Sequence, residues 1–125
     1  LADENKVPSA KVAEAIKIGG YWNSGQDCTA ASRVVAGPKI YDKLLEELVP
    51  AVESLHVGDP AESEDIEMGP VISQAQQERV LGYIETGQAE GARLVCGGGV
   101  PAHLPVGCYV EPTVVEGASV ARLGK

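Results

Sequence analysis

Cys28 lies in a polar stretch between a helix-like run and a strand-like run, and its setting is unusual for a cysteine. Residues 20–27 before it supply Gly, Asn, Ser, Gln and Asp. In folded proteins, cysteine is more often a small buried hydrophobe among Val, Leu and Ile. A loop between two rigid elements can instead present a thiol to a substrate, as a nucleophile that forms covalent intermediates requires. The spacing makes Cys28 a candidate nucleophile, with a packing role as the alternative.

The other cysteines and the histidines favour structural roles. Cys96 follows two apolar residues in a strand-like run, and Cys108 has no base or metal partner nearby in the sequence. Three cysteines cannot all pair within one molecule, and their spacing does not suit zinc, so we expect a reduced, intracellular protein with no metal site. His56 and His103 lie near turns and far from Cys28 in the sequence. We expect surface or capping roles for them.

Three further patterns could bind a ligand. The run Gly97-Gly98-Gly99 lacks the Lys and Ser or Thr of a phosphate-binding loop, which favours a turn. The acidic residues between 62 and 67 lack the alternating ligand spacing of a calcium loop, which favours a solvated surface. Gln76 and Arg79 stand three positions apart in a helix-like run, where both could face a polar ligand or simply the solvent.

Length and charge narrow the possible functions. The 125 residues suit one small domain, and 44% hydrophobic with 22% charged residues is typical of a globular chain. A net charge of −8 disfavours nucleic acid and anionic membranes as partners. The apolar runs fall short of the about 18 residues that a membrane span needs. We therefore expect a cytoplasmic protein. We also expect that the sequence, from Leu1 to Lys125, is cut from a longer chain.

The hydrophobic pattern predicts a layered α/β fold. Apolar residues recur at helical spacing in three segments, and short apolar runs bounded by Gly and Pro indicate strands. A mixed order of helices and strands is typical of an α/β sheet with some parallel pairing. The expected elements are a helix over 9–22, a strand over 31–36, a helix from 39 to 53, a helix capped by Ser73 and ending near 90, and strands over 92–96 and 108–115.

The cysteine stretch, residues 23–33, closely resembles the catalytic-cysteine signature of the NAD(P)-dependent aldehyde dehydrogenase family. Within that family, residues 22–28 are most similar to enzymes that act on aminoaldehydes such as 4-aminobutyraldehyde. Further stretches match in the family's order: Val57-Gly58-Asp59-Pro60, Met68-Gly69-Pro70, Leu81-Gly82-Tyr83-Ile84, Glu90-Gly91-Ala92, Cys96-Gly97-Gly98-Gly99 and Tyr109-Val110-Glu111-Pro112-Thr113.

The resemblance implies a site and a domain. Residues 1–125 would form part of a layered α/β/α catalytic domain with a partly parallel sheet, without the cofactor-binding domain. Cys28 would be the nucleophile, and Gln76 and Arg79 would approach the adenosine ribose of NAD or NADP. The substrate would be an aldehyde and, by the narrower similarity, an aminoaldehyde. The parent protein would be a homo-oligomer.

The resemblance also identifies what this sequence does not contain. The family's upstream oxyanion-stabilising Asn, its upstream Glu that activates water, and its downstream Glu-x-Phe-Gly-Pro segment are not among these 125 residues. We therefore expect no dehydrogenase activity from the chain alone. Two alternatives stay open: a stand-alone α/β binding or scaffold domain with an idle Cys28, and a thiol hydrolase that acts on activated esters.

Overall fold

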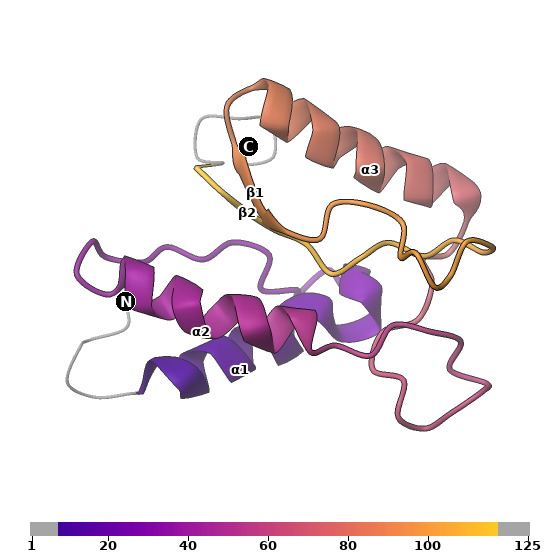
Figure 1. Ribbon diagram of the computed structural model, residues 1–125, viewed down its shortest axis with the longest axis horizontal. Coiled ribbons are helices and arrows are strands. Elements are labelled where there is room, and N and C mark those ends of the chain that lie inside the picture. Colours follow the sequence, from indigo (N-terminus) through magenta and orange to yellow (C-terminus); the bar gives the residue numbers. More distant parts are fainter. Residues whose placement is uncertain (1–7, 118–125) are drawn as a thin grey trace.

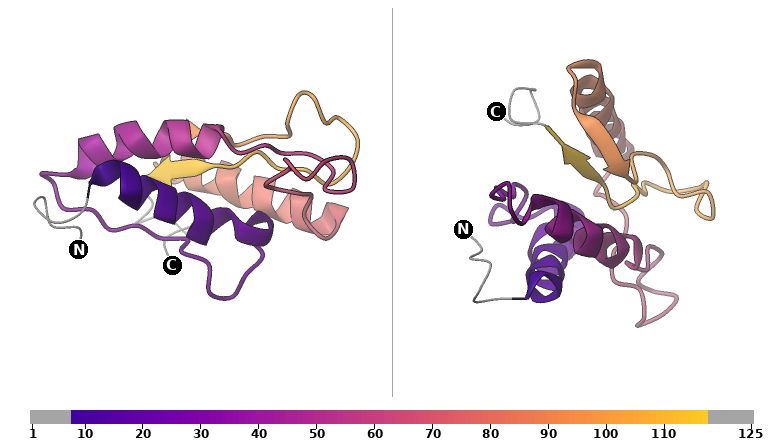
Figure 2. Two further views of the ribbon diagram at one scale, coloured as in Figure 1. Left: turned by 90° about the horizontal axis from the view of Figure 1, so that it is seen from below. Right: turned by 60° about the vertical axis from the view of Figure 1, so that its left-hand side comes forward.

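Two helices that run in the same direction form one layer of the molecule (Figures 1 and 2). The computed structural model describes residues 8–117, in which α1 (Ser9–Tyr21) and α2 (Tyr41–Glu53) pack along each other (Figure 1). Both helices lie where the sequence predicts them. The first continues directly into a short 3-10 turn, η1 (Trp22–Gly25), and the second continues through Pro50 to its end.

The core lies between these helices and the first strand. Leu44, Leu48 and Val52 recur every four residues on α2, so they share one face, and all three are buried. Ala13 on α1 and Cys96 on the first strand complete the buried cluster. Removing a Val or Leu side chain from water stabilises the fold by about 1.5–3 kcal/mol, so this face of α2 holds the layer together.

The third helix, α3 (Gln74–Ala89), begins at a side-chain cap. The Ser73 hydroxyl accepts a hydrogen bond from the Gln76 N–H, at 3.2 Å, and so satisfies one of the unpaired donors of the first turn. The predicted cap at Ser73 is confirmed.

The two strands lie between the α1–α2 pair and α3, as Figures 1 and 2 show. These strands, β1 (Arg93–Cys96) and β2 (Val114–Glu116), form a two-stranded sheet. The Tyr41 hydroxyl at the start of α2 donates to the Glu116 carboxylate at 2.7 Å, which joins the helical layer to β2. The α/β fold class is confirmed.

β1 and β2 run antiparallel, with an irregularity between Leu94 and Cys96. The sequence predicts a partly parallel sheet without specifying which strands pair in parallel, and this pair belongs to its antiparallel part. Residues 97–113 return the chain beside β1 without forming a helix. A connection between parallel neighbours must cross over the sheet and usually contains a helix. A parallel bridge joins Val57 to Met68, but it lies outside both strands.

Two predicted strand segments are irregular. Residues 31–36 form no strand, and Val34 and Val35 are exposed. A strand needs a neighbour to take its N–H and C=O groups, and within residues 8–117 this segment donates only from Ala31 to Gly19 and from Ser32 to Ala30. Residues 108–113 are likewise irregular, and the strand begins only at Val114.

Candidate functional site: an exposed cysteine loop

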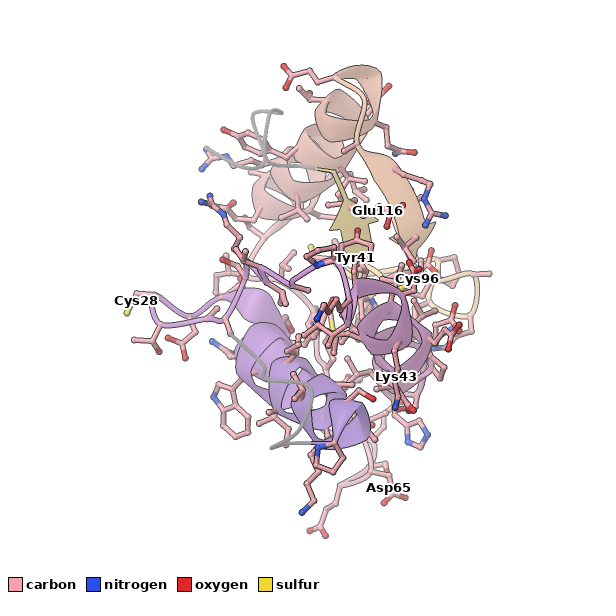
Figure 3. All side chains as sticks on the ribbon, turned by 90° about the vertical axis from the view of Figure 1, so that its left-hand side faces the viewer. Cys28, Tyr41, Lys43, Asp65, Cys96 and Glu116 are labelled. Carbon is pink, nitrogen blue, oxygen red and sulfur yellow. The ribbon has the colours of Figure 1, made fainter. Side chains whose placement is uncertain are left out.

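Cys28 lies on a loop that begins where η1 ends. Residues 26–40 contain no helix or strand, and the Cys28 side chain is exposed with a free thiol. Figure 3 shows this side chain at the outer end of its loop, well away from Cys96. The thiol is therefore accessible to a molecule in solution.

The backbone before Cys28 turns through three consecutive left-handed residues. Asn23, Ser24 and Gly25 have φ angles of 50°, 59° and 74°. Glycine adopts this conformation readily, whereas for other residues it costs about 1–2 kcal/mol. Asn23 offsets part of this cost, since its Nδ2 donates to the Gln26 carbonyl at 3.2 Å. Such a turn persists when surrounding contacts hold it.

Side chains from this turn bond to a distant segment of the chain. The Ser24 hydroxyl donates to the Gly69 carbonyl at 2.7 Å, and Gln26 Oε1 accepts from the Ile72 N–H at 2.9 Å. Neither role was predicted from the sequence, because no local pattern indicates which distant backbone groups a serine or a glutamine will reach.

Asp27, next to the thiol, is held as a carboxylate. Its Oδ1 accepts the backbone N–H and the hydroxyl of Thr29, both at 2.8 Å. These hydrogen bonds, the backbone one first, lower the pKa of Asp27 below its usual value. The charge of this carboxylate repels an anionic reagent that approaches the exposed Cys28 thiol.

Substitution of Asp27 tests this electrostatic effect. Asp27→Asn removes the charge while keeping an acceptor for Thr29, so we expect Cys28 to react with the anionic reagent iodoacetate about two- to fivefold faster at pH 7. Mass spectrometry of the labelled peptide measures the rate. Glu85→Gln, which removes an exposed carboxylate from α3, is the matched control and should leave the rate unchanged. Equal rates in wild type and Asp27→Asn would refute the effect.

Gln76 and Arg79 lie on α3, apart from the thiol. The Gln76 side chain is half-buried and Arg79 is exposed, and within residues 8–117 no hydrogen bond or ion pair of either side chain is present. Gln77, between them, faces the protein, since its Nε2 donates to the Tyr109 carbonyl at 2.8 Å. No described contact joins Gln76 or Arg79 to Cys28. The link between the two regions is the bond from Ile72, just before α3, to Gln26.

The other cysteines and the histidines lie elsewhere. Cys96 is buried, and burial raises the pKa of its thiol, as expected for a packing residue. Cys108 is half-buried. His56 Nδ1 lies 3.3 Å from the Asp65 carbonyl, and His103 Nε2 lies 3.1 Å from the Val57 carbonyl. Within the described residues neither histidine contacts Cys28.

A cavity of about 230 Å³ opens on a different part of the surface, and Cys28 is not among its lining residues. Glu53, His103 and Glu111 contribute its polar groups. Over residues 8–117 no group of three or more His, Cys, Asp or Glu side chains is placed to hold a metal ion. None of the helices in that range is long and apolar enough for a membrane span.

Sequence comparison identifies the family of the chain. The pattern of the aldehyde dehydrogenase family matches residues 5–122. The chain is 40% identical over 111 residues to chloroplastic betaine aldehyde dehydrogenase of Amaranthus hypochondriacus, which covers 89% of the chain and 22% of that enzyme. It is 40% identical over 105 residues to peroxisomal aminoaldehyde dehydrogenase 2 of Malus domestica, covering 84% and 21%.

Solved structures show the same fold. The chain superposes with a TM-score of 0.90 on an aldehyde dehydrogenase of Mycobacterium tuberculosis in complex with NAD⁺, at 35% identity, covering 97% of the chain and 25% of that protein. It superposes with a TM-score of 0.89 on gamma-glutamyl-gamma-aminobutyraldehyde dehydrogenase of Burkholderia cenocepacia, at 34% identity, covering 98% and 24%.

The class that these matches define is the aldehyde dehydrogenases, and the chain belongs to the aldehyde dehydrogenase family. It spans about a fifth of the length of the curated relatives that it matches.

Proposed function

We propose that this chain is the cysteine-bearing part of the catalytic domain of an NAD(P)-dependent aldehyde dehydrogenase, with Cys28 as the nucleophile. The observation that carries the proposal is the exposed, unpaired thiol at the outer end of a loop within a family-typical fold. A nucleophile must be reachable by its substrate, and Cys28 meets this requirement, whereas the buried Cys96 does not.

The chemistry divides oxidation into two covalent steps. The Cys28 thiolate adds to the aldehyde carbon, forming a carbon–sulfur bond, and the oxygen of the resulting thiohemiacetal carries the negative charge. A bound NAD(P)⁺ would supply the acceptor for the aldehyde hydrogen, which leaves as a hydride with its two electrons. The thioester left on Cys28 is then hydrolysed by water, which releases the carboxylic acid and restores the thiol. The backbone N–H of Cys28, which has no hydrogen-bond acceptor within residues 8–117, is available to stabilise the oxyanion.

Only part of a cofactor site lies in this chain. The Gln76 amide and the Arg79 guanidinium supply donors that suit the hydroxyl groups of a ribose, and they lie one turn apart on α3. The catalytic Asn and Glu and the cofactor-binding domain expected from the family are not among these 125 residues. We therefore propose that the chain alone does not reduce NAD(P)⁺.

The proposed substrate is a small cationic aldehyde, such as betaine aldehyde or 4-aminobutyraldehyde. Relatives named betaine aldehyde and aminoaldehyde dehydrogenases support this class. The net charge of −8 also favours the approach of a cation. We further propose a cytosolic enzyme, supported by the three free cysteines, and a homo-oligomeric parent protein, supported by the family resemblance.

Steady-state assay of the protein that contains this chain together with its catalytic and cofactor domains tests the proposal. Absorbance at the NADH wavelength should rise with 4-aminobutyraldehyde or betaine aldehyde and NAD⁺ or NADP⁺, whereas the 125-residue chain should give no signal. Octanal, an uncharged aldehyde, is the control for charge preference and should have a lower kcat/KM. A parent protein that reduces neither cofactor with any of these aldehydes would refute the function.

A further inference from the structure

The cysteine loop, defined as residues 23–29, holds the left-handed turn and Cys28, and two of its side chains bond to a segment 45 and 46 residues further along the chain. Ser24 Oγ donates to the Gly69 carbonyl at 2.7 Å, and Gln26 Oε1 accepts from the Ile72 N–H at 2.9 Å. Both bonds use backbone groups of the distant segment. The loop is therefore attached at two points, on either side of Gly25.

The segment that receives these bonds is itself well fixed. Met68 and Val71 are buried, and the Val71 N–H donates to the Cys108 carbonyl at 2.9 Å. Ser73, immediately after Ile72, caps α3. Residues 68–73 therefore connect the folded core to the start of a helix, and their position depends on both.

Apart from these bonds, the segment around Cys28 is held by the bond from the Ala31 N–H to the Gly19 carbonyl, at 2.9 Å, and by bonds within the segment itself. Residues 25–29 are all exposed. Within the loop, Gln26 Nε2 donates to the Asn23 carbonyl at 3.2 Å, so Gln26 bonds to the left-handed turn and to the distant segment at once. A turn made of left-handed residues needs such outside contacts to persist.

We infer that Gln26 and Ser24 are positioning residues that fix the direction of the Cys28 thiol by fastening its loop to residues 69–72. The inference rests on the proposed function of Cys28 as nucleophile. Small displacements of a reacting group lower rates steeply, so a loop fastened two residues before the nucleophile holds the sulfur where an aldehyde carbon can meet it. Neither side chain touches the reacting atoms.

A nitroxide attached to Cys28 measures how well the loop is held. In the 125-residue chain carrying Cys108→Ser, Cys28 is the exposed cysteine that remains, because Cys96 is buried. Gln26→Met, which keeps the length of the side chain but removes its hydrogen bonds, should shift the nitroxide spectrum toward faster motion. Gln26→Glu keeps an acceptor for the Ile72 N–H and should restore part of the slower motion.

Two further variants make this measurement decisive. Ser24→Ala removes only the bond to Gly69 and should also shift the spectrum toward faster motion. If Gln26→Met loses its helical circular dichroism signal, Ser24→Ala tests the fastening of the loop in its place. Gln74→Met removes another exposed glutamine bond, from Nε2 to Glu78 on α3, and should shift nothing. Spectra of Gln26→Met and Ser24→Ala that match the spectrum of Gln74→Met would overturn the inference.

Kinetics of the parent protein separate this inference from the proposed function. Gln26→Met should lower kcat for aldehyde oxidation about tenfold while leaving the KM for NAD⁺ unchanged, because it displaces the thiol but not the cofactor. An unchanged kcat would overturn the positioning role. A wild-type parent without aldehyde oxidation would instead refute the proposed function, and the nitroxide spectra would then decide whether the loop is fastened as inferred.

Discussion

Cys28→Ser is expected to lower the kcat/KM of the parent protein for aldehyde oxidation by roughly four orders of magnitude or more. Oxygen replaces sulfur with almost no change of shape, so the loop and its bonds to Gly69 and Ile72 should persist. A serine hydroxyl, however, is a far weaker nucleophile than a cysteine at neutral pH, and without a covalent intermediate neither step of the proposed chemistry proceeds. Absorbance of NADH in a steady-state assay measures the loss.

Cys108→Ser is the matched control for this loss. Cys108 is a second free cysteine that is not buried, but its carbonyl, and not its thiol, makes the bond to Val71. The control should retain most of the wild-type activity. The free energy of unfolding of Cys28→Ser should lie within about 0.5 kcal/mol of the wild-type value, since the side chain is exposed. A loss of activity then cannot be attributed to unfolding. Wild-type activity in Cys28→Ser would show that the thiol is idle.

The features predicted correctly from the sequence depend on neighbours within a few residues. Leu44, Leu48 and Val52 form one face because they recur every four residues, and the cap at Ser73 depends on a donor three residues away. The exposure of Cys28 follows from its polar neighbours in the same way. Such local signals are present in any single sequence.

The features that the sequence did not predict depend on distant partners. Residues 31–36 have a strand-like composition, but within the described residues no strand lies beside them, so the pattern alone could not determine the outcome. The antiparallel pairing of β1 with β2 also depends on how the chain returns between residues 97 and 113. The bonds that fasten Ser24 and Gln26 join backbone groups about 45 residues away, which no spacing rule identifies.

Gly97→Ala is expected to destabilise the chain by about 2–4 kcal/mol, more than the same substitution at Gly117 or Gly37. Gly97 follows β1 with φ +73°, a conformation that disfavours any side chain, and a Cβ placed there would lie 2.3 Å from the Pro112 carbonyl oxygen. That oxygen belongs to the backbone just before β2, so the clash cannot be relieved by turning a side chain. Urea unfolding followed by far-ultraviolet circular dichroism measures the change in the free energy of unfolding.

Two other glycines separate the clash from the backbone strain. Gly117→Ala places a methyl group at the same φ of +73° with no atom of residues 8–117 within 4 Å, so it should cost only about 1 kcal/mol. Gly37→Ala has neither a left-handed φ nor a neighbour within 4 Å in the described part of the chain and should be nearly neutral. If Gly97→Ala costs no more than Gly117→Ala, the Pro112 carbonyl does not exclude a side chain at residue 97. A clearly larger cost would show that the chain before β2 passes too close to residue 97 for any residue but glycine.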